Sequence, residues 1–416
     1  MVTTVLEQVG MRLWPLALGV IACTCWGTIA AAQAMPATPT DGKRDFSGSL
    51  SLRGLYDSNF ARSDVATAAQ RGIARQDYSL SPSVNLKIVQ PLGQQLVYVN
   101  GSAGYNFYRE NDQLNRGRAD VQGGYMTRLG PCALFANGVY AAAQSDLSTL
   151  DAPTVKNLLQ TSTVAAGAQC GRGGLSGGIS AQRTSTKNSA AIQDDADSDT
   201  QAVSVSLGYG NQTLGQFGVS YAYSSSEFPN VILPGRPIGD GFFSESLSLT
   251  AQKRFGSKLT TRGSVGRTKV KREFVPPGGE LKFNSTNYML GVDYLLGSRL
   301  TLALSADRAV LPSGRAGKLY DIRTGARFSG SYKLGSRFVV GFGHSYDDIN
   351  SNADTSLPGL KVITDSQTHS SFASIRYRQN ENASIALDVR YDDRSANLKE
   401  FNYTAMRVGV TAEVGF

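Results

Sequence analysis

The sequence has no long apolar stretch after its first 34 residues. Beyond Ala34, no run approaches the roughly 20 apolar residues that a transmembrane helix needs. A membrane protein built from helices is therefore excluded for residues 35–416.

Histidine is nearly absent, with His344 and His369 the only two. Ester hydrolysis by a Ser–His pair would need one of them, and both fall near the ends of aromatic-rich predicted strands. We therefore predict no enzyme and no catalytic residue. The acidic run at 194–199 has the ligand type that Ca²⁺ prefers, but a solvated loop explains it better. No metal, cofactor or nucleic-acid partner is predicted.

Cysteine is scarce, with four residues, and two of them lie in a predicted export signal. Met11 and Arg12 precede an apolar run at 13–32, and Ala32-Gln33-Ala34 has the pattern of a cleavage site. We predict a cleaved signal peptide over 1–34, with a single membrane helix or a lipoprotein signal as alternatives. Cys132 and Cys170 then form an even pair in an exported chain, which predicts one disulfide; two free thiols are the alternative.

What the sequence has in abundance is alternation. In 402–416 the residues Met406, Val408, Val410, Ala412, Val414 and Phe416 share one face of a strand, and polar residues or glycines share the other. Similar segments recur from residue 45, separated by eight short turns and nine longer connections, hence 18 strands. This predicts an all-β fold over 45–416, a transmembrane antiparallel up-and-down barrel with short periplasmic turns and long extracellular loops. Sixteen strands, a propeller and a soluble sandwich are the alternatives, and 35–44 is a short periplasmic segment.

Polar residues on the second face of these strands are predicted to line a wet lumen, because a charge facing lipid costs about 2–4 kcal/mol at the membrane midplane. The net charge of +8 lies wholly in residues 242–416, where Lys and Arg exceed Asp and Glu by 24 − 16. We expect a mildly cationic lumen or substrate path, unless these arginines simply pair with carboxylates. The predicted path comprises Arg53, Arg254, Arg262, Arg323, Arg327, Lys333, Arg376, Arg378, Asp388, Arg390, Asp392 and Arg407.

Two of the longer connections are unusually apolar. Residues 228–240 include Phe228, Ile232 and Leu233, and residues 355–365 include Leu357 and Leu360. We predict that they fold inward as constriction loops, with packing on the rim as the alternative. A basic run at 269–272 lies at the outer end of a predicted strand, where it would meet lipopolysaccharide phosphates or only solvent.

Two short motifs carry a resemblance to known proteins. A terminal aromatic after alternating apolar residues, here Phe416, resembles the assembly signal of outer-membrane barrels and implies recognition by the barrel-assembly machinery. The string Tyr56-Asp57-Ser58-Asn59 resembles the N-terminal signature of the β-barrel porin 2 family, whose members include exopolysaccharide-export barrels. That resemblance implies an 18-stranded pore that passes a polysaccharide outward together with a periplasmic polysaccharide-export protein.

The expected function is therefore an outer-membrane channel, in the lipid and lipopolysaccharide of a Gram-negative cell, that exports an anionic or acetylated exopolysaccharide. A general or substrate-selective uptake porin is one alternative, and a plugged structural or adhesive barrel without transport is the other. A monomer is expected rather than a trimer.

Overall fold

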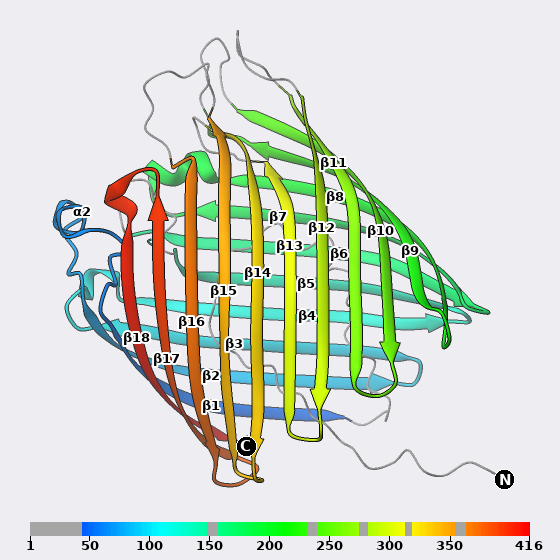
Figure 1. Ribbon diagram of the computed structural model, residues 1–416, viewed down its shortest axis with the longest axis horizontal. Helices are drawn as coiled ribbons and strands as arrows, with labels where there is room; N and C mark the ends of the chain where they lie inside the picture. Colours follow the sequence, from blue (N-terminus) through cyan, green and yellow to red (C-terminus); the bar gives the residue numbers. More distant parts are fainter. Residues whose placement is uncertain are drawn as a thin grey trace.

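The computed structural model shows one closed sheet of 18 antiparallel strands (Figure 1). The structure describes residues 44–145, 147, 156–231, 239–273, 282–312, 318–353 and 363–416. The predicted count of 18 is confirmed, and 16 is excluded. The strands are β1 (Asp45–Asp57), β2 (Asp77–Leu92), β3 (Gln95–Tyr108), β4 (Arg116–Leu129), β5 (Cys132–Gln144), β6 (Leu158–Arg172), β7 (Leu175–Asn188), β8 (Ser198–Asn211), β9 (Gly215–Phe228), β10 (Asp240–Phe255), β11 (Leu259–Arg272), β12 (Lys282–Leu296), β13 (Leu300–Pro312), β14 (Lys318–Leu334), β15 (Phe338–Ala353), β16 (Asp365–Arg378), β17 (Ala383–Ala396) and β18 (Tyr403–Gly415).

The sheet closes because the last strand pairs with the first. Strand β1 lies between β2 and β18, with Leu50 opposite Val414 and Leu52 opposite Ala412 on the β18 side. Closure leaves no strand edge with unpaired backbone groups, which is the condition for a sheet to cross a membrane.

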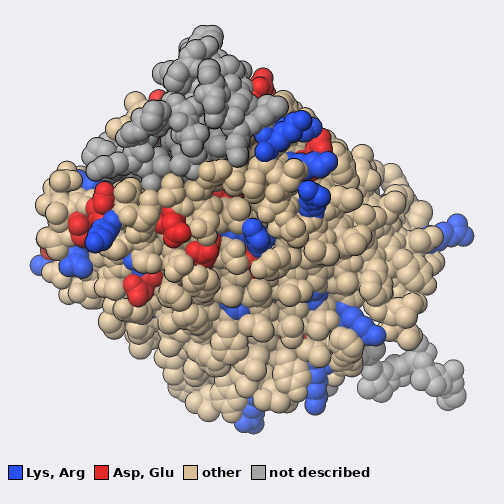
Figure 2. Space-filling view, turned by 45° about the horizontal axis from the view of Figure 1, so that its top comes forward, with Lys and Arg blue, Asp and Glu red and all other residues tan. Residues whose placement is uncertain are grey.

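The outer face of the barrel is apolar and exposed. Leu249 on β10, Ile385 on β17 and Val410 on β18 are each at least half exposed, and all belong to the outward set of the alternation. In Figure 2 most of the visible face is tan, with few charged side chains in its broad areas. An apolar band around a closed sheet is a lipid-facing surface, so this protein is an outer-membrane barrel. No helix within the described ranges is long and apolar enough to cross a membrane.

Short turns join strands at one end, where both termini of the barrel also lie. Glycines with φ between 59° and 72° occupy the turns after β2, β4, β10, β12 and β14. A positive φ strains any residue with a Cβ, so glycine at these positions selects the tight hairpin. This end is periplasmic by the rule that outer-membrane barrels keep their short turns there.

The longer connections carry the few helices. These are α2 (Val65–Gln70), η1 (Asp112–Leu114), η3 (Ala191–Ala196) and η4 (Lys399–Phe401). The Asp64 carboxylate caps α2 by accepting from the Thr67 N–H at 2.7 Å; this hydrogen bond lowers the pKa of Asp64. A buried cluster of Ala61, Ala68, Ile73, Leu114 and Leu147 packs these connections together above β1–β5.

Cys132 and Cys170 are joined by a disulfide. Cys132 opens β5 and faces Cys170 of β6 directly in register, with an S–S distance of 2.07 Å. The bond lies at the periplasmic end of this strand pair.

Removing this disulfide should lower stability but not change the fold. Cross-linking two residues 38 positions apart removes loop entropy from the unfolded chain worth about 4 kcal/mol. We expect the double variant Cys132→Ser with Cys170→Ser to unfold at lower urea concentration than the oxidised wild type. Reductant should shift the wild type to the same midpoint and leave the variant unchanged. If the oxidised wild type unfolded at the same urea concentration as the double variant, the disulfide would not stabilise the barrel.

Candidate functional site

The inner face of the barrel holds every predicted path residue. Outward positions are fixed by the exposed apolar side chains, and their register neighbours alternate with the inward set. By this alternation, all twelve charged residues predicted for the lumen belong to the inward set: Arg53, Arg254, Arg262, Arg323, Arg327, Lys333, Arg376, Arg378, Asp388, Arg390, Asp392 and Arg407.

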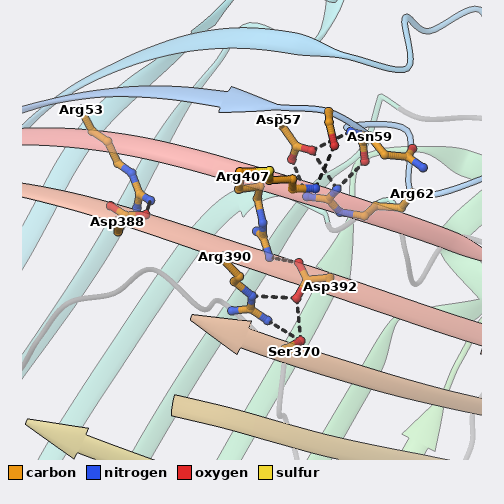
Figure 3. A network of polar contacts seen from close by, with 11 residues as sticks. Arg53, Asp57, Asn59, Arg62, Ser370, Asp388, Arg390, Asp392 and Arg407 are labelled. Atoms are coloured by element: carbon orange, nitrogen blue, oxygen red, sulfur yellow. Dashed lines mark hydrogen bonds and ion pairs between the residues drawn. The ribbon is translucent and has the colours of Figure 1, made fainter. Parts of the chain in front are cut away.

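One cluster on this face joins β16, β17 and β18 (Figure 3). Arg390 Nε donates to Asp392 Oδ1 at 2.8 Å, and Arg407 binds the other oxygen of the same carboxylate. The Ser370 hydroxyl donates to Asp392 at 2.6 Å and accepts from Arg390 at 3.1 Å. The Asp392 side chain is 4% exposed, whereas the two arginines are about one quarter exposed. Two guanidinium groups therefore share one carboxylate, and the cluster keeps a net charge of +1.

A second cluster repeats this arrangement on β14 and β15. Asp347 accepts from Arg323 Nη2 at 2.6 Å and lies 3.6 Å from Arg327 Nη2. Arg327 is half exposed, so its charge faces the lumen; the Asp307 carboxylate of β13 lies next to Asp347, on the other side of Gly325. Asp347 was absent from the sequence-based path; its alternation with the outward Phe342 and Tyr346 was the signal that would have placed it inside.

Two other predicted arginines are neutralised one to one. Arg53 donates to Asp388 at 2.9 Å, and Arg262 lies 2.8 Å from Asp293. For these pairs the alternative drawn from the sequence, simple charge pairing, describes the structure. The lumen keeps its positive balance because of the two-to-one clusters and the unpaired residues at its periplasmic end.

The opposite wall of the lumen has no charged side chains. Among the described inward positions of β5 to β9, hydroxyl, amide and small residues dominate, and Lys, Arg, Asp and Glu are absent. Hydroxyl pairs link these strands, including Ser180 with Ser204 at 2.7 Å and Thr163 with Thr184 at 3.0 Å. In a ring of 18 strands, β7 and β16 are 16 − 7 = 9 positions apart and so face each other. Figure 1 shows β4–β7 behind β14–β18. A charged wall thus faces a hydroxyl-rich wall, a pairing that the sequence analysis missed.

The string Tyr56 to Asn59, which carried the family resemblance, closes the barrel seam. The Ser58 Oγ accepts from the Met406 N–H at 2.8 Å, and Asn59 Nδ2 donates to the Thr404 carbonyl at 3.2 Å. Asp57 accepts from Arg62 Nη2 at 2.5 Å and from the Asn59 N–H at 3.0 Å (Figure 3). These contacts fasten β1 and the connection after it to β18 at the extracellular end.

The terminal Phe416 fastens the same seam at the periplasmic end. Its N–H donates to the Gly48 carbonyl at 2.8 Å, and the Gly48 N–H donates to its carbonyl at 3.0 Å. A Cβ on Gly48 would lie 2.5 Å from the Phe416 ring, so glycine is what lets the ring lie flat on β1. Recognition of Phe416 by the assembly machinery stays a prediction.

The predicted constriction loops are only partly described. Phe228 is not in a loop: it ends β9 on the inner face, 5% exposed, and packs edge-on against Phe242 at 5.8 Å. Ile232, Leu233, Leu357 and Leu360 lie outside the described residues, so the constriction stays a prediction.

The histidines lie on the outer face near the extracellular end. Their rings are 5.7 Å apart, and His344 Nδ1 is 2.9 Å from the Ser371 hydroxyl. Within the described part of the chain, no group of three or more metal-binding side chains occurs. In the basic run, Lys269 and Lys271 point outward, whereas Arg272 turns inward and forms a buried pair with Asp240 at 2.7 Å. Contact of the two lysines with lipopolysaccharide stays a prediction.

Comparison with known proteins supports the fold. No protein-family model and no curated protein sequence matches the chain. Among solved structures it is similar to OccK2 (OpdF) of Pseudomonas aeruginosa, with 12% identity, a TM-score of 0.50 and coverage of 89% of this chain and 98% of that one. It is also similar to OccK9 (OpdG) of that organism, with 12% identity, a TM-score of 0.49 and coverage of 89% and 99%. At this identity the likeness to OccK2 shows a shared barrel fold, and the polysaccharide-export resemblance remains a prediction.

Proposed function

We propose that this barrel is a passive outer-membrane channel that takes up small hydroxylated anions, such as sugar acids. The observation that carries the proposal is the pair of two-to-one arginine–aspartate clusters facing a hydroxyl-rich wall. Of the functions expected from the sequence, we therefore prefer the uptake porin to the exopolysaccharide exporter.

The chemistry of the two walls suits such a solute. The Arg390–Arg407–Asp392 cluster retains one positive charge beside water, and Arg327 presents a second, half-exposed guanidinium to the lumen. Rings or ladders of Arg and Lys favour anions in a pore. A carboxylate at one end of a solute is attracted to Arg327 or Arg390, the half-exposed and quarter-exposed members of the clusters. Serine and threonine hydroxyls both donate and accept, so the facing wall exchanges hydrogen bonds with sugar hydroxyls as they pass.

Export of an anionic or acetylated exopolysaccharide is the second candidate. It is favoured by one observation: inward arginines continue from Arg378 at the periplasmic end of β16 to Arg390 and Arg407 further along the lumen. A polymer needs contacts over the whole height of a pore, whereas a small solute needs them at one level. This candidate also requires a periplasmic export partner.

Ion selectivity in planar bilayers tests the channel. We expect the wild type to carry an anion-selective current. In the triple variant Arg323→Ser, Arg327→Ser and Arg390→Ser, the anion-to-cation permeability ratio should fall roughly two- to threefold, because each substitution removes a positive charge from the lumen. Arg183→Ser is the matched control, since Arg183 lies on the outer face and pairs with Asp199. It should leave the ratio unchanged.

The same preparation separates the three candidates. Galacturonate should permeate vesicles that carry the barrel, while a short oligogalacturonate should not. Passage of the oligomer would favour export. A folded barrel that conducts nothing would instead support the plugged structural barrel.

A further inference from the structure

The periplasmic end of the barrel carries a concentrated set of cations along β10–β17. Three lie in consecutive short turns: Lys258 between β10 and β11, Arg299 between β12 and β13, and Arg337 between β14 and β15. Four more occupy inward positions at the ends of the adjoining strands: Arg254, Lys333, Arg376 and Arg378. We call these seven residues the cationic collar.

The collar is not neutralised by its surroundings. None of its members forms an ion pair within the described ranges, and all except the half-buried Arg376 are exposed. Of the carboxylates near this end, Asp293 pairs with Arg262, and Glu413 accepts from Ser49. Glu381, in the turn after β16, is the exposed carboxylate beside the collar. Along the lower border of Figure 2, blue side chains stand without red neighbours.

The other end of the barrel treats its charges differently. Arg272 and Asp240 form a pair that is 5% and 3% exposed, and Arg62 and Asp57 form one that is 10% and 5% exposed. Exposed cations occur at that end too, including Arg75, Lys187 and Lys399, so what distinguishes the periplasmic mouth is that its cations follow one another along consecutive turns.

The spacing of the collar makes its field continuous. Neighbouring strands lie about 4.8 Å apart, so successive hairpin turns lie roughly 10 Å apart. This matches the Debye length of about 8–10 Å at 0.1–0.15 M salt. The potentials of adjacent turns therefore overlap at physiological salt and add strongly at lower salt. An anion at the mouth meets one positive arc instead of separate charges.

We propose that the cationic collar is an anion-collecting vestibule at the periplasmic mouth, which binds extended carboxylated saccharides that touch more than one turn. The inference deepens the proposed function and rests on its open channel. Four collar residues point into the lumen, so an anion held there lies on the conduction path. The vestibule binds such a chain more tightly from the periplasmic side, because the seven collar cations lie together at that mouth.

Sided block and rectification test the vestibule in bilayers of phosphatidylcholine, a lipid without net charge. Short oligogalacturonate added at the periplasmic mouth should block the current at a concentration at least tenfold lower than at the extracellular mouth. In 0.1 M KCl, the current should be larger at the polarity that drives anions from the collar into the lumen. At that polarity, cations that enter from the extracellular mouth are held back by the positive collar, so both ions accumulate in the lumen and raise its conductance. In 1 M KCl the asymmetry should largely vanish.

Variants locate the effect. The variant with Arg254→Gln, Lys333→Gln, Arg376→Gln and Arg378→Gln should lose both the sided block and the rectification. Arg172→Gln is the matched control, an exposed cation at the same end on β6, outside the collar; it should behave as the wild type.

The outcomes separate this inference from the proposed function. The vestibule alone would be overturned if the wild type were anion-selective but oligogalacturonate blocked it equally from both sides. It would also be overturned if oligogalacturonate blocked the collar variant as it blocks the wild type. Rectification that appears only after phosphatidylglycerol is added would assign the collar to lipid headgroups and also overturn it. A wild type without anion selectivity would overturn the proposed function itself.

Discussion

Replacing Asp57 by alanine is expected to destabilise the barrel by about 3–5 kcal/mol, the cost of removing one partner of a buried ion pair. The Asp57 and Arg62 side chains are 5% and 10% exposed and bind each other through two nitrogen–oxygen contacts. Asp57 also accepts from the Asn59 N–H and so sets the path of the connection that leaves β1. The variant should unfold at a markedly lower urea concentration than the wild type. The measurement is heat modifiability on gels, which separates the folded barrel from the unfolded chain by mobility.

Asp64→Ala is the matched control for this experiment. Asp64 is a carboxylate in the same connection, but it is exposed and caps the six-residue helix α2. Loss of an N-cap costs about 1 kcal/mol, so the control should shift the unfolding midpoint only slightly. Equal shifts for the two variants would contradict the account of Asp57 as a seam residue.

Much of this fold follows from the alternation of residues, because the two faces of a strand are a local property of its sequence. Alternation of Ile385, Leu387 and Val389 was enough to place Arg390 and Asp392 inside. The strand count followed from short apolar–Gly–polar–polar–apolar turns, such as those with Gly297 and Gly335, because this pattern is typical of a tight hairpin. Both glycines have a positive φ in the structure.

What alternation does not carry is the pairing between strands. The sharing of Asp392 by Arg390 and Arg407 depends on register between β17 and β18, where these two arginines stand opposite each other. A shift by one residue would reverse the faces. The charged wall lies opposite the hydroxyl-rich wall only because the sheet closes into a ring, and no single strand encodes that closure.

The role of the Tyr56 to Asn59 string shows the same limit. A short motif identifies residues, but the sequence does not say what they contact 345 positions away, as Asn59 does on reaching the Thr404 carbonyl. Here the motif serves the seam, so its presence supports barrel closure more directly than it supports any particular cargo.

Asp392→Asn is expected to change selectivity most among single lumenal substitutions. It removes one negative charge and keeps the side-chain shape, so the cluster of Arg390 and Arg407 rises from a net charge of +1 to +2. We expect the anion-to-cation permeability ratio to rise roughly twofold at 0.1 M salt, with a smaller rise at 1 M salt as screening shortens the reach of the charge. The reversal potential in a KCl gradient measures it. Stability should fall by about 2 kcal/mol, less than for a fully buried pair because both arginines are one quarter exposed.

The matched control separates lumenal charge from total charge. Asp348→Asn makes the same change in net charge, but Asp348 alternates with the inward Asp347 and lies on the outer face beside Asn350. If permeating ions sense the wall they pass, Asp348→Asn leaves the reversal potential unchanged while Asp392→Asn shifts it toward the anion potential. Equal shifts would mean that ions respond to the overall charge of the barrel, and the two-to-one clusters would then have no special part in selectivity.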